Sequence, residues 1–271
     1  MKKRIDILLV DKGFAGTRTK AQAMLMSGSV FIGGQRVDKV GTLVEETAEV
    51  EIREKFPYVS RGALKIEKAY EEFDLNFQDK VICDIGSSTG GFTDFALQHG
   101  AKKVFAVDVG YGQLDRKLRE DSRVVVMEKT NFRDIESRDD FSKRVILTCP
   151  GSKNHVKNAD SGQARMTIEK IDYFVCDVSF ISLKKIIPQI KKIADYSTEC
   201  ILLIKPQFEV GKEIADKTKG VIRDEEIQRA VVEDIAKFAE SSGFRVQGIT
   251  DSPITGAKGN KEFLLWLAFN R

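Results

Sequence analysis

The sequence predicts a two-domain α/β protein, in which a small α+β domain precedes a doubly wound, mostly parallel sheet. Two observations predict it: two short helical patterns and a hairpin pattern end near residue 57, and apolar strand-like runs alternate with helical patterns after residue 60. The chain has 271 residues, of which 42% are hydrophobic and 31% charged. This composition supports real cores and excludes a disordered tail, a mini-protein or a fibre.

The amino-terminal segment predicts two short amphipathic helices and a hairpin. Apolar residues recur at helical spacing over residues 5–13 and 17–28, each stretch ends at a glycine, and Thr17 is expected to cap the second helix. The run VFIGGQRV (30–37) predicts a hairpin around two glycines, and AEVEI (48–52) alternates as a strand does. Because Pro57 disfavours helical geometry in the residue before it, we place the domain boundary after residue 57.

The carboxy-terminal domain, residues 58–271, contains seven candidate strands. Most are continuous apolar runs, as expected for parallel strands that helices cover on both faces. They are VICDI (81–85), VFAVD (104–108), VVVM (124–127), YFVCD (173–177), CILLIK (200–205), RVQGI (245–249) and FLLWLAF (263–269). Residues 137–170 are polar and poorly patterned, and we interpret them as a surface insertion.

Charge is nearly balanced overall but uneven along the chain. Lys and Arg number 44 and Asp and Glu 41, a formal charge of +3 that does not by itself indicate a nucleic-acid partner. Residues 1–40, however, hold eight basic residues and three acidic ones, and an acidic run follows. The amino-terminal segment is therefore expected to carry a basic face.

Cysteine usage and hydropathy exclude several classes of protein. The four cysteines are far apart with no C-x-x-C pair, so no metal site is expected, and Cys83 and Cys176 are predicted as buried thiols in a reducing compartment. No stretch approaches the roughly 20 apolar residues of a membrane span. Asp6 and Asp11 interrupt the basic, apolar start, which argues against a signal peptide and for a cytoplasmic protein.

Charged residues close four of the predicted strands. Asp84, Asp108, Asp177 and Lys205 stand at strand carboxyl ends, where ligands bind in open α/β sheets. Each could be a simple strand terminator, but four at one edge indicate a site.

The turn after the first large-domain strand predicts a cofactor site. It reads DIGSSTGGF (84–92), which matches neither the dinucleotide nor the phosphate-loop pattern and offers no lysine for a phosphate. An acid two residues before the first glycine suits a ligand with an amino group, and Asp108 is placed to accept hydrogen bonds from ribose hydroxyls. S-adenosylmethionine carries both an amino group and ribose hydroxyls, so it fits this turn. The alternative is a strand-to-helix turn with a purely structural role. The predicted cofactor-binding residues are Asp84, Gly86, Ser88, Thr89, Gly90, Gly91, Phe92, Asp108 and Asn131.

Eight segments spread over the chain carry a resemblance to a known family. They are YVSRGALK (58–65), DIGSSTGGFTD (84–94), VDVGYGQL (107–114), EKTNFRD (128–134), CDVSFISL (176–183), IKPQFEVGK (204–212), GVIRD (220–224) and SPITGAKGNKEFLLWL (252–267). The chain resembles the TlyA (hemolysin A) family, in which an S4-type RNA-binding domain precedes an FtsJ-like ribosomal RNA methyltransferase domain of the Rossmann-like class. The resemblance implies methyl transfer from S-adenosylmethionine to a ribose 2'-hydroxyl of ribosomal RNA, with cytidine as the base. The family's catalytic Lys-Asp-Lys-Glu tetrad falls on Lys65, Asp177, Lys205 and Glu262.

The tetrad implied by the resemblance can act in two ways. Lys205 could remove the hydroxyl proton if it is neutral, which burial and the second ammonium of Lys65 favour and the two carboxylates oppose. Alternatively Lys205 positions the hydroxyl, because alignment of oxygen, methyl carbon and sulfur is worth up to about 7–11 kcal/mol. Both readings stay open at this point.

The basic residues of the first domain follow the S4-type pattern. Arg4, Arg18, Lys20 and Arg36 are expected to contact phosphates of ribosomal RNA or of ribosomal subunits, and binding should weaken steeply with salt. A solvated basic helix is the alternative. Lys143, Arg144, Lys153, Lys157 and Arg165 in the insertion add either a further RNA contact or an inert excursion.

Two other functions compete with an RNA methyltransferase. One is a non-catalytic RNA-binding or ribosome-assembly factor that keeps the cofactor pocket as a relic, against which the four tetrad residues argue. The other is the membrane activity that the hemolysin name suggests, which no apolar span or strongly amphipathic basic helix supports.

Overall fold

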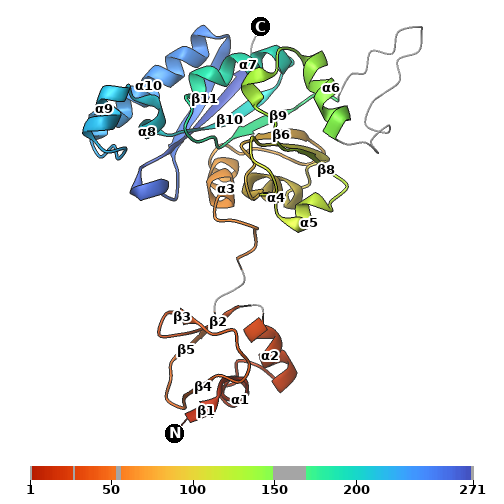
Figure 1. Ribbon diagram of the computed structural model, residues 1–271, viewed down its shortest axis with the longest axis vertical. Helices are drawn as coiled ribbons and strands as arrows, with labels where there is room; N and C mark the ends of the chain where they lie inside the picture. The colour runs from red at the N-terminus through yellow and green to blue at the C-terminus, as the bar shows by residue number, and fades with distance from the viewer. Residues whose placement is uncertain (1, 27, 53–55, 149–168, 270–271) are drawn as a thin grey trace, which may run out of the picture. The chain divides into compact units, whose positions relative to one another are not determined.

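The computed structural model describes residues 2–26, 28–52, 56–148 and 169–269. Contacts divide the chain into two compact units, residues 1–57 and 58–271, each with its own core (Figure 1). The first unit is α+β and the second is a seven-stranded α/β sheet. The predicted fold class is confirmed.

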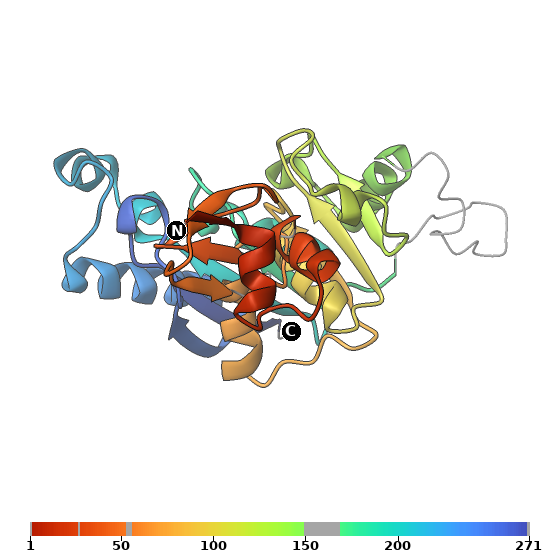
Figure 2. The same ribbon diagram turned by 90° about the horizontal axis from the view of Figure 1, so that it is seen from below.

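The small unit holds the two predicted helices beside short antiparallel strands (Figure 2). Thr17 caps the second helix, since its Oγ1 accepts a hydrogen bond from the Lys20 amide at 3.2 Å. Gly33 and Gly34 both have positive φ, which the two-residue hairpin turn requires. The elements are β1 (Lys2–Arg4), α1 (Ile5–Asp11), α2 (Arg18–Met26), β2 (Val30–Ile32), β3 (Gln35–Arg36), β4 (Leu43–Glu45) and β5 (Val50–Ile52).

The strands β1 and β4 were not predicted. They pair with each other antiparallel, apart from the β3-β2-β5 sheet. Each is three residues long, too short for an alternating apolar pattern to be recognised in sequence.

The large unit is built on one sheet in the order β11-β12-β10-β9-β6-β7-β8. The five strands from β10 to β8 run parallel, and β12 is antiparallel to both β10 and β11. All seven predicted strands are present, with ends that differ by no more than two residues. They are β6 (Val81–Ile85), β7 (Lys103–Val107), β8 (Val124–Met127), β9 (Tyr173–Cys176), β10 (Glu199–Ile204), β11 (Phe244–Asp251) and β12 (Phe263–Phe269).

Helices cover both faces of this sheet, which explains why its strands are apolar on both sides (Figure 1). Along β6, Val81, Cys83 and Ile85 enter the core beneath α6, α7 and α10, whereas Ile82 enters the core beneath α3, α4 and α5. The helices are α3 (Ala63–Glu72), α4 (Gly91–Gln98), α5 (Arg116–Arg119), η1 (Phe132–Asp134), α6 (Arg138–Thr148), η3 (Leu183–Lys185), α7 (Ile187–Ile193), α8 (Pro206–Glu209), α9 (Lys212–Lys217), α10 (Glu225–Ser241) and η4 (Ala257–Gly259).

The predicted surface insertion over residues 137–170 is wrong for its first third, which is helix α6. Phe141 is fully buried against Phe105, with ring centroids 5.5 Å apart, and Val145 is 1% exposed. The chain leaves the sheet edge at β8 and returns to β9 beside β6, so the connection must cross and cover a sheet face. Lys143 and Arg144 belong to this helix, and Lys153, Lys157 and Arg165 lie outside the described residues.

Three cysteines are buried free thiols: Cys83 and Cys176, as predicted, and Cys200. Cys149 lies outside the described residues. Within the described ranges, no group of three or more His, Cys, Asp or Glu side chains could hold a metal ion. None of the helices described here is long and apolar enough to cross a membrane.

Candidate active site

Two lysines and two carboxylates meet at the carboxyl edge of the sheet. Lys65 Nζ lies 3.0 Å from Asp177 Oδ2 and 2.8 Å from Glu262 Oε2. Lys205 Nζ lies 2.5 Å from Asp177 Oδ1. The structure therefore brings together all four residues of the expected tetrad, with one oxygen of Asp177 for each lysine.

The topology of the sheet explains this meeting. Asp177 and Lys205 directly follow the adjacent parallel strands β9 and β10, so both stand at the same edge. Strand β12 is antiparallel to β10 and pairs Phe263 with Ile204, which places Glu262 at that edge as well. Lys65 arrives from the first turns of α3. Side chains from four elements thus converge on one point.

Three of the four charged side chains are buried, the Asp177 side chain is 20% exposed, and the charges compensate one another. Glu262 is 2% exposed and both lysines are 7% exposed. Burial works against the ammonium form of Lys65, but the carboxylates of Asp177 and Glu262 outweigh it and raise the Lys65 pKa. Burial likewise works against ionised Asp177, but Lys205 and Lys65 lower its pKa. Both groups are therefore charged at neutral pH.

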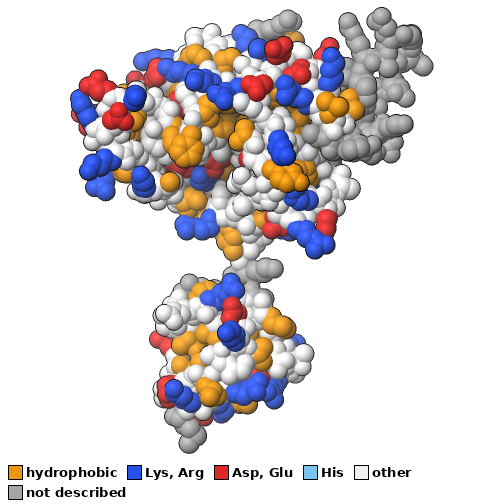
Figure 3. Space-filling model, in the orientation of Figure 1, with side chains coloured by type: hydrophobic (Ala, Val, Ile, Leu, Met, Phe, Trp, Pro, Cys, Tyr) orange, Lys and Arg blue, Asp and Glu red, His pale blue; other side chains and the backbone are white. Residues whose placement is uncertain are grey.

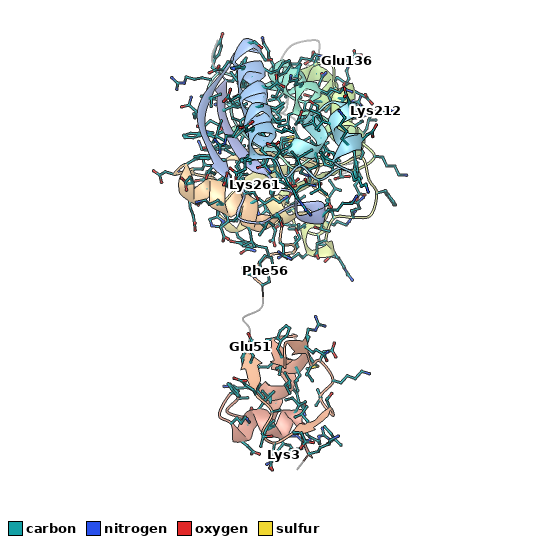
Figure 4. All side chains as sticks on the ribbon, turned by 90° about the vertical axis from the view of Figure 1, so that its left-hand side faces the viewer. Lys3, Glu51, Phe56, Glu136, Lys212 and Lys261 are labelled. Atoms are coloured by element: carbon teal, nitrogen blue, oxygen red, sulfur yellow. The ribbon has the colours of Figure 1, made fainter. Side chains whose placement is uncertain are left out.

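The loop before β12 closes over Glu262. A side chain at Gly256 would collide with the Glu262 carboxylate, so the backbone approaches it as only glycine permits. The neighbouring Lys261, labelled in Figure 4, instead reaches the surface and pairs with Asp251 at 2.9 Å. Two successive residues just before β12 thus differ in exposure, one buried in the site and the other in a surface ion pair.

Two adjoining cavities open at this edge. The first, of about 370 Å³, holds the tetrad, and the second, of about 450 Å³, extends along the ends of β7 and β8. They share Gly86, Ser88, Asp177, Ser179 and Phe180. Of the predicted cofactor-binding residues, the first is lined by Asp84, Gly86, Ser88, Thr89, Gly91 and Phe92, and the second by Gly86, Ser88, Asp108 and Asn131.

Asp84 lies in the wall of the first cavity, where helix α4 holds it. Its Oδ2 accepts hydrogen bonds from the Thr93 amide at 3.0 Å and the Thr93 hydroxyl at 2.7 Å. The side chain is 1% exposed, and this burial raises the Asp84 pKa to about 7. One carboxyl oxygen is therefore engaged within the protein.

Asp108 organises the glycine turn. Its Oδ2 accepts from the Ser88 amide at 2.8 Å and its Oδ1 accepts from the Gly110 amide at 2.7 Å. An ionised carboxylate has about four acceptor sites, so it retains capacity for a ligand hydroxyl. Asn131 similarly uses its Oδ1 to cap η1 through the Arg133 amide.

The glycines of the turn serve internal packing. A Cβ at Gly86 would lie 2.8 Å from the Asp177 carbonyl oxygen, and Gly86 also has a φ of 82°. A Cβ at Gly90 would collide with Leu118, and Gly90 is not among the described residues that line either cavity. The expectation that these glycines admit a ligand therefore has a second explanation within the fold.

Sequence reasoning missed several residues that line the first cavity. Phe180 is 90% exposed, has a φ of 63° and lies 4.9 Å from Phe208 between ring centroids. A positive φ is unusual for a bulky residue and is a signal of local constraint that only coordinates reveal. The other lining residues that were not predicted are Ser60, Gly62, Ser87, Ser179, Gln207, Phe208, Gly256 and Ala257.

The basic residues of the small unit are organised by Asp6, which the sequence analysis used only as an argument against a signal peptide. Asp6, fully buried, accepts from Arg4 Nε at 3.0 Å and from Arg18 Nε at 2.7 Å. The hydrogen bond from Arg4 and then that from Arg18 outweigh burial and hold the Asp6 pKa well below its ordinary value. Arg36 pairs with Asp38 at 3.2 Å. Lys20 is exposed.

Charge on the large unit is mixed. Lys and Arg side chains are interspersed with Asp and Glu side chains on the face drawn in Figure 3. This agrees with the nearly balanced composition, and it gives no single-sign field on that face.

Fold and site together define a methyltransferase with an S4 domain before it. The FtsJ-like methyltransferase family matches residues 58–269, and the S4 domain family matches residues 3–50. The Bacillus subtilis protein YqxC is 43% identical over 98% of this chain and 85% of its own length. A Mycobacterium tuberculosis protein named 16S/23S rRNA (cytidine-2'-O)-methyltransferase TlyA is 35% identical over 97% of this chain and 89% of its own.

A solved structure agrees with these relatives. A candidate hemolysin from Streptococcus thermophilus is 40% identical, covers 99% of this chain and 89% of its own, and has a TM-score of 0.68. The chain belongs to the TlyA (hemolysin A) family.

Proposed function

We propose that this protein transfers a methyl group from S-adenosylmethionine to the 2'-hydroxyl of a ribosomal RNA ribose, at a cytidine. The observation that carries the proposal is the Lys65, Asp177, Lys205 and Glu262 cluster, buried where two cavities adjoin. The name of the Mycobacterium tuberculosis relative supports the substrate and the base. A ribosomal RNA substrate also implies a cytoplasmic protein.

The residues present fit S-adenosylmethionine. The acidic group Asp84 lines one cavity and Asp108 the other, so carboxylates are available on the amino-acid side and on the nucleoside side. Neither cavity presents the lysine-bearing phosphate loop that a nucleotide phosphate would require. When bound, the cofactor supplies a methyl group on a positively charged sulfur.

The ionic contacts of Lys205 support a positioning role. Its Nζ lies 2.5 Å from Asp177 Oδ1 and donates a hydrogen bond to Ser179 Oγ at 3.0 Å, and these two contacts restrain the direction of its N–H groups. A lysine Nζ restrained in this way can present an N–H donor to an acceptor oxygen. We therefore assign Lys205 to holding the acceptor oxygen in line, with its hydroxyl proton released to solvent as the new O–C bond forms and the C–S bond breaks.

The rim of the first cavity suits a nucleobase. Phe180 and Phe208 present two contacting aromatic rings there, and Phe180 is almost fully exposed. Proteins commonly hold unstacked RNA bases on aromatic side chains. We assign Phe180 to contact with the target base, and Arg4, Arg18, Lys20 and Arg36 of the S4 domain to contact with RNA phosphates.

The experiment is tritiated methyl transfer to unmodified ribosomal RNA or subunits, followed by mapping of ribose methylation. Lys205→Ala is expected to lower the single-turnover rate at least about 100-fold, because it removes a buried charged group at the acceptor oxygen. Lys212→Ala, at the exposed start of α9 (Figure 4), is the matched control and should keep the parent rate. S-adenosylmethionine binding by calorimetry checks that both variants keep the cofactor site.

Other outcomes identify the competing functions. Equal incorporation by the Lys205→Ala variant and the parent would remove Lys205 from its role. Cofactor binding by the parent without methyl incorporation into any ribosomal RNA would favour a non-catalytic assembly factor. Leakage of liposomes caused by the purified parent would favour a membrane activity.

A further inference from the structure

A serine hydroxyl completes the hydrogen bonding of Lys205. Lys205 Nζ donates to Ser179 Oγ at 3.0 Å, in addition to its contact with Asp177 at 2.5 Å. We propose that Ser179 is a positioning residue, which fixes the direction of the Lys205 ammonium toward the acceptor hydroxyl. The proposal rests on the proposed function and adds a residue to its machinery.

The two lysines of the site are held differently. Lys65 contacts two carboxylates, Asp177 and Glu262, and both contacts restrain its ammonium. Lys205 contacts only one carboxylate among the described residues, and its second hydrogen-bond partner is the neutral Ser179 hydroxyl. A lysine ammonium is a compact charge on a flexible four-carbon chain, so a single partner leaves its direction free. The Phe208 ring also lies near Lys205, with its centroid 5.9 Å from Nζ. Among the described residues, only Ser179 offers a directed hydrogen bond beside the Asp177 contact.

Ser179 stands at the junction of the two cavities. It lines both of them, and it is exposed whereas Lys205 is 7% exposed. The hydroxyl thus lies between the buried Lys205 and the wall shared by the two cavities, along which the proposed cofactor would extend. Lys205 has three N–H donors, and with two of them engaged the third remains for the acceptor oxygen.

The fold holds the Ser179 loop and the Lys205 segment together. Helix α8 begins directly after Lys205, and its Glu209 accepts a hydrogen bond from the Leu183 amide at 2.8 Å. Phe180, next to Ser179, has a left-handed backbone with a φ of 63°, which a bulky residue keeps only where the surrounding structure imposes it. The distance between Ser179 and Lys205 is therefore set by two anchored segments.

The test is Ser179→Ala, with Ser182→Ala as a control in the same loop. A hydrogen bond to a charged group contributes about 1.5–3 kcal/mol, so the single-turnover rate should fall about 10- to 100-fold. Binding of S-adenosylmethionine and of RNA should stay within about twofold, and Ser179→Thr, which keeps the hydroxyl, should recover most of the rate. Ser182 caps η3 and hydrogen-bonds Glu209 rather than Lys205, so its variant loosens the same loop and should lower the rate much less than Ser179→Ala. An equal loss in Ser182→Ala would assign the effect to the loop and overturn the proposal.

A double-mutant cycle separates this proposal from the proposed function. If Ser179 acts through Lys205, then Ser179→Ala should cost nothing further in a Lys205→Ala background. Additive losses would instead mean that Ser179 acts independently of Lys205. If Lys205→Ala abolishes transfer and Ser179→Ala does not alter it, the proposed function stands and this inference fails. If Lys205→Ala has no effect, the assigned role of Lys205 is wrong, and the proposal for Ser179, which depends on it, is wrong as well.

Discussion

At the scale of residues, Asp177 organises the site. Each of its two oxygens receives one lysine, and Glu262 gives Lys65 a second carboxylate. Two ammonium groups and two carboxylates compensate each other in a buried space, where an unpaired charge would be very unfavourable. Under the proposed function, this cluster presents lysine N–H donors to the acceptor oxygen.

Asp84 gives a prediction on pH and stability. Burial raises its pKa from 3.8 to about 7, so the folded protein favours the protonated carboxyl. As pH rises from about 4 to about 7, ionisation of Asp84 is harder in the folded state than in the unfolded state, and the parent loses this part of its stability. Asp84→Asn stays neutral, so its melting temperature minus that of the parent should increase between pH 4 and pH 8.

Thermal unfolding without cofactor measures this difference. Glu213→Gln, at an exposed carboxylate on α9, is the control and should follow the pH dependence of the parent. A difference between Asp84→Asn and the parent that stays constant over this range would contradict the raised pKa.

At the scale of elements, helix α6 shows the limit of local pattern. Its sequence is mostly polar, and only Phe141 and Val145 reach the hydrophobic core on that face. The connection from the edge strand β8 to β9 places these two side chains on the sheet. Phe141 and Val145 lie one helical turn apart, and their contact with the sheet makes the segment part of the core.

Phe141→Ala should lower the free energy of unfolding by about 3–5 kcal/mol, because it leaves a cavity beside Phe105. Leu147→Ala on the same helix is the control, since Leu147 is 78% exposed, and it should change stability by less than about 0.5 kcal/mol. Denaturant unfolding measures both. Equal, small effects would show that α6 does not support the core.

At the scale of the whole molecule, the chain joins a basic S4 unit to a methyltransferase unit. The first core belongs to residues 1–57, and the cluster of Lys65, Asp177, Lys205 and Glu262 belongs to residues 58–271. Under the proposed function, substrate binding and chemistry should therefore respond to different substitutions. Asp6 holds Arg4 and Arg18 in place in the first unit, while Lys20 is exposed.

Lys20→Ala should weaken binding to ribosomal RNA and reduce the slope of log affinity against log salt by roughly 0.7–0.9, the value of one phosphate contact. The single-turnover rate at saturating RNA should stay near that of the parent. Lys237→Ala on α10, whose side chain is 76% exposed, is the control. If affinity and salt slope are unchanged in Lys20→Ala, the result would contradict an RNA contact at Lys20 and support a solvated helix.

Part of this architecture could be predicted from local pattern. The seven large-domain strands follow from continuous apolar runs, and Asp84, Asp108, Asp177 and Lys205 follow from their places at strand ends. Lys65 and Glu262 could not be placed by pattern, because a lysine on a helix and an acid before a strand are common; the family resemblance was needed for both.

The sequence by itself determined the elements, the fold class and the residue types at the sheet edge, since hydrophobic period and strand-end chemistry are local properties. Only the tertiary structure decided which charges meet. Lys65 and Asp177 are 112 residues apart in the chain, and Ser179 reaches Lys205 across two strand ends. These contacts depend on how distant segments pack, as do the burial of α6 and the contacts of two arginines with Asp6. Local sequence patterns cannot predict that packing.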